Sequence, residues 1–274
     1  MRQFGVNQMP KKRVASMAAF LRNGKSVLLA YDQGFEHGPS TDFNERNIDP
    51  SYVMDIAVKG GFNGIVFQKG LAEKYYNGKI PLIVKVNGKS ALPKMEPNSK
   101  QNCSVEYAIG SLGAKGIGYT IYLGSQFEGE MFKEFGTIQE EAHERGIPAI
   151  AWIYPRGQAV ANDSSQEIVA YAARVGLELG ADAVKIKYTG DSESFSWAVR
   201  SAGKARVFMS GGPKAPTDLD FLRQVSGVMQ AGATGLAVGR NVWQNEDPLR
   251  LTKNLKKIIF ENMSAESVGE QIIS

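Results

Sequence analysis

The chain has 274 residues, of which 43% are hydrophobic and 22% are charged. These proportions exclude an intrinsically disordered chain, and the length suits one α/β barrel domain, a fold of about 250 residues. The formal net charge of +4 is dispersed. The two basic segments, residues 11–13 and 253–257, contain no interleaved aromatic residues, so nucleic-acid binding is not expected. Thirty glycines indicate many tight turns or close backbone contacts.

Several other classes of protein are also not expected. The longest uninterrupted apolar stretch, residues 149–154, is far shorter than the roughly 20 residues of a membrane helix, and the N-terminus lacks a signal-peptide pattern. We therefore expect a cytoplasmic protein without a membrane partner. Cys103 is the single cysteine, which indicates a structural thiol. The two histidines, His37 and His143, share no metal-ligand spacing, so no metal site is expected.

Eight short apolar runs are predicted as strands. Each is followed by polar or glycine residues and then by a segment with helical periodicity, and glycine-containing turns precede several of them. In chain order the runs are residues 26–31, 64–68, 82–86, 117–123, 149–154, 183–188, 206–209 and 235–238.

Helices are predicted between these runs. An apolar face with a spacing of three to four residues is typical of a helix packed on a sheet. In the segment 165–179 this face is formed by Ile168, Ala172, Val175 and Leu179, and Ser164 or Ser165 precedes Glu167 as a capping pattern. The other predicted helices are residues 51–59, 104–112, 126–145 and 218–231, and residues 88–102 are predicted as a long loop.

Strands that alternate with helices imply a parallel sheet. Eight units of about 34 residues predict an α/β fold with a single (β/α)8 TIM barrel. We expect an N-terminal helical extension at residues 1–24, the barrel at 25–260 and a C-terminal tail at 261–274. A doubly wound sheet is the alternative, but no G-x-G-x-x-G follows the first strand.

The run 183–188 holds the most informative pair of residues. Side chains alternate along a strand, so Val184 and Ile186 should face the helices while Lys185 and Lys187 point into the barrel. Burial and a second cation lower the pKa of a lysine, and a neutral lysine is what a Schiff-base nucleophile requires. Alternatively, the pair neutralises an inward carboxylate such as Asp32 or holds a phosphate. The spacing leaves these alternatives open.

Two further groups of residues lie at the predicted carboxyl ends of strands. These ends form the usual active-site face of a barrel. Trp152 and Tyr154 share the inward face of the run 149–154; the phenol could transfer protons, or both side chains could simply fill the core. The glycine-rich turns at 211–212 and 239–240 follow the last two strands, where barrels commonly bind phosphate through backbone N–H groups.

Five motifs in this order resemble the archaeal-type class I fructose-1,6-bisphosphate aldolases, over residues 27–248. The motifs are Asp32-Gln33-Gly34-Phe35-Glu36-His37-Gly38-Pro39, Trp152-Ile153-Tyr154-Pro155-Arg156, Lys185-Ile186-Lys187-Tyr188-Thr189-Gly190-Asp191, Ser210-Gly211-Gly212 and Gly239-Arg240-Asn241-Val242-Trp243-Gln244.

The resemblance implies a barrel enzyme that cleaves fructose 1,6-bisphosphate through a lysine Schiff base, without a cofactor. It implies Lys185 as the Schiff-base lysine, Tyr154 as the proton donor and acceptor, and Asp32 as an assisting carboxylate. The implied substrate-binding residues are Trp152, which shapes the pocket, Ser210, Gly211, Gly212, Gly239 and Arg240 at the dihydroxyacetone phosphate end, His37 and Arg156 at the other phosphate, and Lys187 as a neighbouring charge.

Other activities remain open from the sequence. Related barrels make a deoxy-amino-sugar precursor of aromatic amino acids, 2-amino-3,7-dideoxy-D-threo-hept-6-ulosonate, or act as thiolase-like acyltransferases on phosphorylated signalling compounds. A non-catalytic phosphosugar-binding protein is the alternative from another class. The partner expected in each case is a small phosphorylated molecule. Members of the resembled family are commonly decameric, so a homo-oligomer is expected.

Overall fold

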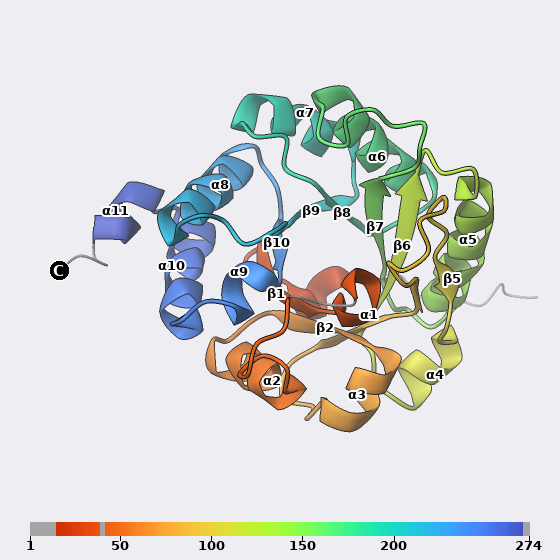
Figure 1. The fold of residues 1–274 in the computed structure, drawn as a ribbon, viewed down its shortest axis with the longest axis horizontal. Helices are drawn as coiled ribbons and strands as arrows, with labels where there is room; N and C mark the ends of the chain where they lie inside the picture. Colours follow the sequence, from red (N-terminus) through yellow and green to blue (C-terminus); the bar gives the residue numbers. More distant parts are fainter. Residues whose placement is uncertain (1–14, 39–41, 271–274) are drawn as a thin grey trace, which may run out of the picture.

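A computed structural model describes residues 15–38 and 42–270. Eight parallel strands close into a barrel in the order β1-β10-β9-β8-β7-β6-β3-β2 (Figure 1). The predicted (β/α)8 barrel is therefore confirmed, and the doubly wound alternative is wrong because β1 pairs with both β2 and β10. The barrel strands are β1 (Ser26–Tyr31), β2 (Gly64–Gln68), β3 (Leu82–Lys85), β6 (Gly116–Leu123), β7 (Ala149–Pro155), β8 (Ala183–Ile186), β9 (Arg206–Ser210) and β10 (Gly235–Val238).

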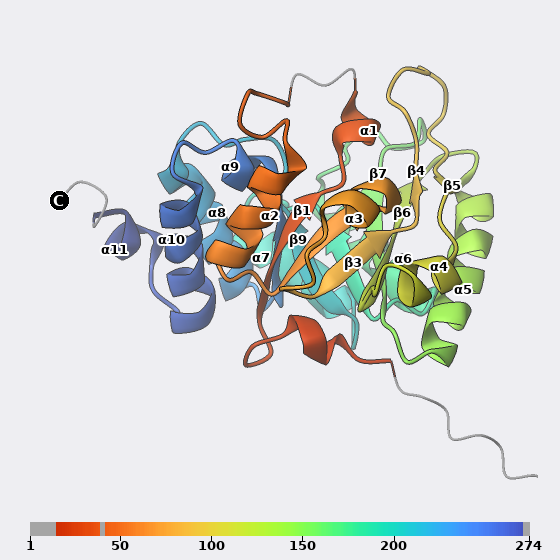
Figure 2. The same cartoon turned by 90° about the horizontal axis from the view of Figure 1, so that it is seen from below.

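Helices surround the barrel as an outer ring (Figure 1). Seen from the side, α1, α9 and the β4–β5 pair lie towards one end of the barrel, and the short helix η1 lies at the other (Figure 2). No helix in the described ranges is long and apolar enough to cross a membrane. The helices are η1 (Met17–Phe20), α1 (Gly34–His37), α2 (Pro50–Lys59), α3 (Lys69–Tyr75), α4 (Val105–Gly110), α5 (Glu128–Glu144), α6 (Gln166–Glu178), α7 (Ser192–Ser201), α8 (Asp218–Gln230), α9 (Arg240–Trp243), α10 (Pro248–Glu261) and α11 (Ala265–Glu270).

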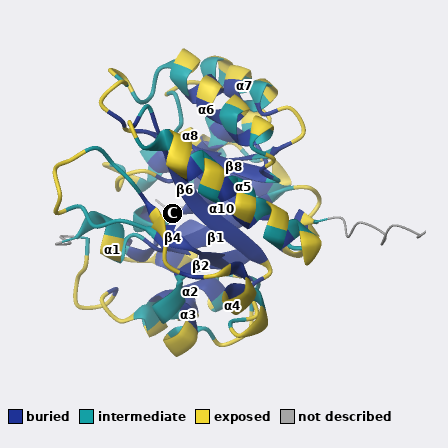
Figure 3. Cartoon of the chain, turned by 90° about the vertical axis from the view of Figure 1, so that its right-hand side faces the viewer, coloured by how far each residue is buried: buried dark blue, intermediate teal, exposed yellow. Residues whose placement is uncertain are grey.

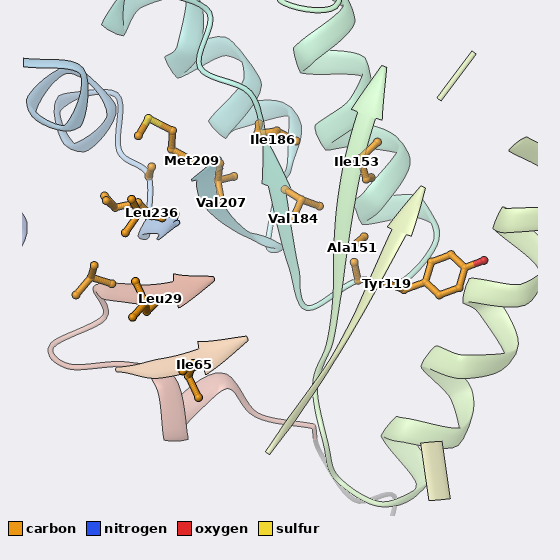
Figure 4. Packing of buried hydrophobic residues seen from close by; sticks show 14 of the residues in the cluster. Leu29, Ile65, Tyr119, Ala151, Ile153, Val184, Ile186, Val207, Met209 and Leu236 are labelled. Atoms are coloured by element: carbon orange, nitrogen blue, oxygen red, sulfur yellow. The ribbon is translucent and has the colours of Figure 1, made fainter. Parts of the chain in front are cut away.

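The hydrophobic core forms two layers. The larger layer fills the space between the strands and the helices and includes Val184 and Ile186 (Figure 4). The smaller layer fills the barrel interior with side chains from the opposite strand faces, among them Leu28, Trp152 and Phe208. The buried strands and the exposed outer faces of the helices are visible in Figure 3. The alternation predicted for residues 184–186 is therefore confirmed.

The predicted face of the helix at 165–179 is rotated from the observed one. Val169, Ala172, Ala173 and Gly176 are buried in α6, whereas Ile168, Val175 and Leu179 are only partly buried. Small residues let α6 approach the sheet, and a Cβ atom at Gly176 would lie 2.2 Å from a methyl carbon of Val184. Close packing thus selects the small residues, which a hydrophobicity pattern ranks below the large ones. The N-cap of α6 is Ser165, whose hydroxyl accepts the backbone N–H of Ile168.

Glycine ends several helices as the spacing predicts. Gly180, which follows α6, and Gly232, which follows α8, have φ angles of 85° and 90°, a region where other residues are strained.

The predicted loop at 88–102 is largely correct, but its ends form a short antiparallel pair of β4 (Asn87–Gly88) and β5 (Lys100–Gln101). Within it, the Glu96 carboxylate accepts the backbone N–H groups of Gln126 and Gln158, which fastens the loop near the ends of β6 and β7.

The amino-terminal end of the barrel is closed by η1. Phe20 is fully buried, and Cβ atoms at Gly64 and Gly116 would lie within 3.0 Å of its ring. Residues 1–14, which include the basic segment 11–13 and most of the predicted extension, lie outside the described residues, as do 271–274 of the predicted tail. The described part of that tail forms α11, where Ala265 and Val268 are buried.

Candidate active site

A cavity of about 570 Å³ opens at the carboxyl ends of the strands. This is the face where barrel enzymes place their catalytic groups. Of the residues predicted for the site, Trp152 is the one that does not line this cavity. The structure brings together the others, namely Asp32, His37, Tyr154, Arg156, Lys185, Lys187, Ser210, Gly211, Gly212, Gly239 and Arg240.

Lys185 reaches this cavity from the interior face of β8. It is the register partner of Trp152 on β7 and of Phe208 on β9, and only 6% of its surface is exposed. Its Nζ atom lies 5.4 Å from the centre of the Trp152 ring. Within the described ranges, no carboxylate lies within ion-pair distance of this nitrogen. Lys185 is therefore an enclosed amine without a direct counter-ion.

Two other lysines of the cavity differ from Lys185 in this respect, and a third, Lys214, is exposed and donates to the backbone carbonyl of Gln244. Lys187 lies just beyond the end of β8 and pairs with Asp163, at 2.6 Å between Nζ and Oδ1. Lys85, at the end of β3, pairs with Asp32 and Glu36. A lysine held by a carboxylate is stabilised as an ammonium, which cannot attack a carbonyl carbon. Burial together with the absence of a carboxylate partner thus distinguishes Lys185 as the candidate nucleophile, and Asp163 balances the charge of Lys187.

Asp32 follows β1 and is 6% exposed. Its Oδ2 atom lies 3.3 Å from Nζ of Lys85. Burial alone raises the pKa of a carboxyl group, but the positive charges of Lys85 and Lys185 and the hydrogen bond from Lys85 outweigh burial and hold the pKa of Asp32 below its ordinary value. Asp32 is consequently a carboxylate at neutral pH, facing the candidate nucleophile.

Tyr154 lies two residues after Trp152 on the same face of β7, and it lines the cavity. The guanidinium carbon of Arg156 lies 4.6 Å from the centre of the Tyr154 ring. Trp152 itself is 1% exposed, and a Cβ atom at Gly118 would lie 2.5 Å from its ring. Its ring lies in the barrel interior beside Lys185 and is not part of the cavity lining. That Trp152 shapes the pocket stays a prediction.

The two glycine-rich turns meet at the cavity wall. Ser210 ends β9, and Gly212 follows with a φ angle of 63°. Asn241 in α9 donates hydrogen bonds to the carbonyl oxygens of Gly211 and Pro213, at 2.7 and 3.0 Å, and its side-chain oxygen accepts the backbone N–H of Ala215. Asn241 therefore holds the turn after β9 against the turn after β10. Asn241 is an amide residue of the fifth sequence motif, and this is the signal in the sequence that could have indicated its role.

Asp42 bridges Arg240 and His37, two residues that line the cavity. Its Oδ1 atom lies 3.5 Å from Nη1 of Arg240, and its Oδ2 atom lies 2.9 Å from Nδ1 of His37. Gln244 donates to its backbone carbonyl. No pattern around residue 42 in the sequence indicates this role, because it depends on tertiary contacts with Arg240 and His37.

Lys85 and Glu36 were also missed by the sequence analysis, although Lys85 carried a signal. In the run 82–86, Ile83 and Lys85 share the face opposite Leu82 and Val84, which is the same pattern that identified Lys185.

In the described ranges, no group of three or more histidine, cysteine, aspartate or glutamate side chains is placed to hold a metal ion.

The fold and the site together define a (β/α)8 barrel enzyme of the Schiff-base class, with an enclosed lysine beside a tyrosine and a carboxylate. Residues 26–245 match the sequence model of the DeoC/LacD family aldolases. The chain belongs to this family.

Characterised relatives agree with this assignment. The chain is 56% identical over 243 residues to the class 1 fructose-bisphosphate aldolase of Thermoproteus tenax, which covers 88% of this chain and 92% of the relative. It is 45% identical over 250 residues to the class 1 fructose-bisphosphate aldolase of Halobacterium salinarum, covering 89% of this chain and 94% of the relative.

Solved structures are similar as well. A Schiff-base-forming fructose-1,6-bisphosphate aldolase, analysed through its reaction intermediates, superposes with a TM-score of 0.86 at 55% identity, over 89% of this chain and 98% of the other. An archaeal fructose-1,6-bisphosphate aldolase with its catalytic lysine covalently bound to a carbinolamine intermediate superposes with the same TM-score and identity, over 89% and 97% of the two chains. The resemblance seen in the sequence motifs is thereby confirmed.

Proposed function

We propose that this chain is a class I fructose-1,6-bisphosphate aldolase, which reversibly cleaves the sugar into dihydroxyacetone phosphate and glyceraldehyde 3-phosphate. The observation that carries the proposal is the amine of Lys185, which is enclosed, lines the cavity and has no direct counter-ion among the described residues. Fructose-bisphosphate aldolases at 56% and 45% identity support the substrate class.

The residues of the cavity supply each step of this reaction. Lys185 attacks the ketose carbonyl carbon, and loss of water leaves an iminium ion between the lysine nitrogen and C2 of the sugar. Tyr154 removes the proton of the C4 hydroxyl, the C3–C4 bond breaks, and its electron pair moves into the iminium to form an enamine. Glyceraldehyde 3-phosphate leaves, the enamine is protonated at C3, and water releases dihydroxyacetone phosphate. The Asp32 carboxylate stabilises the cationic iminium.

Two cationic regions suit the two phosphates. We assign the phosphate of dihydroxyacetone phosphate to the turns at Ser210–Gly212 and Gly239–Arg240, where backbone N–H groups and a guanidinium are available. The far phosphate is assigned to His37 and Arg156. Asp42 pairs with both Arg240 and His37, so a phosphate at either residue would compete with this carboxylate.

The test is turnover of fructose 1,6-bisphosphate by the purified chain, followed by coupled detection of triose phosphate. We expect turnover that survives a metal chelator and is abolished in Lys185→Met. Lys187→Met, in which the neighbouring ion-paired lysine is lost, is the matched control and should retain the Schiff base. Absence of turnover with fructose 1,6-bisphosphate, or loss of turnover on chelation and its recovery with zinc, would overturn the proposal.

Three further expectations remain predictions: the cytoplasmic location, the homo-oligomeric state, and the boundaries at 1–24, 25–260 and 261–274. Light scattering coupled to size-exclusion chromatography measures the oligomeric state directly. Limited proteolysis, with the fragments identified by mass, measures the boundaries.

A further inference from the structure

Lys85 is a buried charge that the reaction steps above do not use. It ends β3, and 1% of its surface is exposed. It pairs with Asp32, which follows β1, and with Glu36 in α1, through a hydrogen bond from its Nζ atom to Oε1 of Glu36. The side chains of Asp32 and Glu36 are themselves only 7% and 8% exposed. Lys85, Asp32 and Glu36 are called the Lys85 cluster below.

The charges of the Lys85 cluster do not cancel. One ammonium and two carboxylates leave one net negative charge beside the cavity floor, where Asp32 faces Lys185. The iminium formed on Lys185 would bring one positive charge to the same place. A buried carboxylate without a partner is strongly disfavoured and tends to take up a proton. The positive charge of Lys85 therefore favours the ionised form of Asp32.

The directions of the pKa values agree with this geometry. Burial by itself lowers the pKa of Lys85, but the carboxylates of Glu36 and Asp32 outweigh burial and raise it. The pKa of Asp32 is lowered, with Lys85 as the largest of the opposing causes that overcome burial. The other titratable or charged groups that face the cluster are Tyr122 from β6, Lys185 from β8, Lys89 just after β4, and Arg156 just after β7.

We propose that Lys85 is a positioning residue of the aldol reaction, which holds Asp32 as an oriented carboxylate against the iminium on Lys185, while Glu36 fixes Lys85 from its other side. Lys85 is not the nucleophile, because its ammonium lies between two carboxylates. This inference rests on the proposed function and adds to it the residue that sets the charge of Asp32.

The test is the pH dependence of kcat/KM for fructose 1,6-bisphosphate cleavage between pH 4 and 9, a range in which the wild-type chain should show no fall from protonation of Asp32, because the pKa of Asp32 lies below its ordinary value. In Lys85→Met the pKa of Asp32 rises, so the carboxylate becomes protonated at a higher pH. We expect the acid limb of the profile to move upwards by about 1 to 3 pH units, the range by which a close opposite charge shifts a carboxyl group. Lys85→Arg keeps the charge and should return the limb to its wild-type position.

A second variant keeps the inference testable if Lys85→Met does not fold. In Lys85→Gln, which removes the charge but keeps a polar side chain, the acid limb should move upwards as in Lys85→Met. A purely structural role for Lys85 predicts a lower kcat with no movement of either limb and no recovery in Lys85→Arg. An acid limb that stays at its wild-type position in Lys85→Met and in Lys85→Gln would overturn the inference. Borohydride trapping of dihydroxyacetone phosphate on Lys185 of the wild-type chain tests the proposed function alone and so separates the two failures.

Discussion

Lys185 and Trp152 are register partners on adjacent strands, and the Nζ atom of the lysine lies 5.4 Å from the centre of the indole ring. The tryptophan is held from its other side, because a Cβ atom at Gly118 on β6 would lie 2.5 Å from the same ring. The indole therefore has no room to move away from the lysine. Its position sets where the reactive amine stands in the cavity.

Gly118→Ala tests this relationship. The added methyl group pushes the indole towards Lys185, and we expect kcat to fall by about 10- to 100-fold, since a displacement near 1 Å of a catalytic group costs this much. Gly129→Ala in α5 is the matched control, because nothing lies within 4 Å of its Cβ position. Steady-state kinetics on both variants measure the difference. Equal kcat values would show that the ring does not set the position of the amine.

Tyr154→Phe removes the phenol that we assign to proton transfer. Loss of a general acid and base lowers kcat by about 10²- to 10⁴-fold, whereas formation of the adduct between Lys185 and dihydroxyacetone phosphate should persist. The control is Tyr122→Phe, whose ring lies 6.4 Å from that of Tyr154 but does not line the cavity. If the two variants lose activity equally, the proton-transfer role belongs elsewhere.

Arg240→Ala removes the guanidinium assigned to the phosphate of dihydroxyacetone phosphate. A hydrogen bond to a charged group contributes about 1.5–3 kcal/mol, so KM for dihydroxyacetone phosphate in the synthesis direction should rise about 10- to 100-fold. Arg223→Ala on α8, which removes an exposed arginine paired with Glu266, is the control. A KM that stays at the wild-type value would place the phosphate at another residue.

Phe20→Ala tests the role of η1 as the closure of the barrel. The side chain is fully buried against the amino-terminal end of the barrel, and its truncation should lower the free energy of unfolding by about 3–5 kcal/mol. Leu249→Ala in α10 removes an exposed side chain and should change the free energy by less than about 0.5 kcal/mol. Chemical denaturation of both variants makes the comparison. Similar midpoints would mean that η1 packs on the barrel without stabilising it.

The sequence predicts the barrel and the inward side chains well, because both follow from local periodicity. Lys185 and Tyr154 alternate with residues that pack against the helices, and this alternation is fixed once the strand is identified. Lys85 follows the same rule, so its buried position was predictable. Its pairing with Glu36 was not, because Glu36 lies on a helix of four residues whose orientation no periodicity predicts.

The partners of the charged residues are the part that the sequence could not predict. Asp163 pairs with Lys187, and Asp42 pairs with Arg240 and His37. Both aspartates lie in connections without regular structure, where side-chain contacts depend on the tertiary path of the loop. Lys185 and Lys187 therefore look equivalent in the sequence. In the structure they differ because Lys187 forms an ion pair and lies beyond the end of β8, whereas Lys185 is buried.

The central claim is that Lys185 forms a Schiff base with the substrate. The most direct test is to reduce the mixture of the chain and dihydroxyacetone phosphate with borohydride, digest it, and locate the adduct by peptide mass mapping. We predict one reduced adduct on Lys185, absent from Lys185→Met and retained in Lys187→Met. An adduct on Lys187 or Lys85, or none on the wild-type chain while it cleaves fructose 1,6-bisphosphate, would contradict the account.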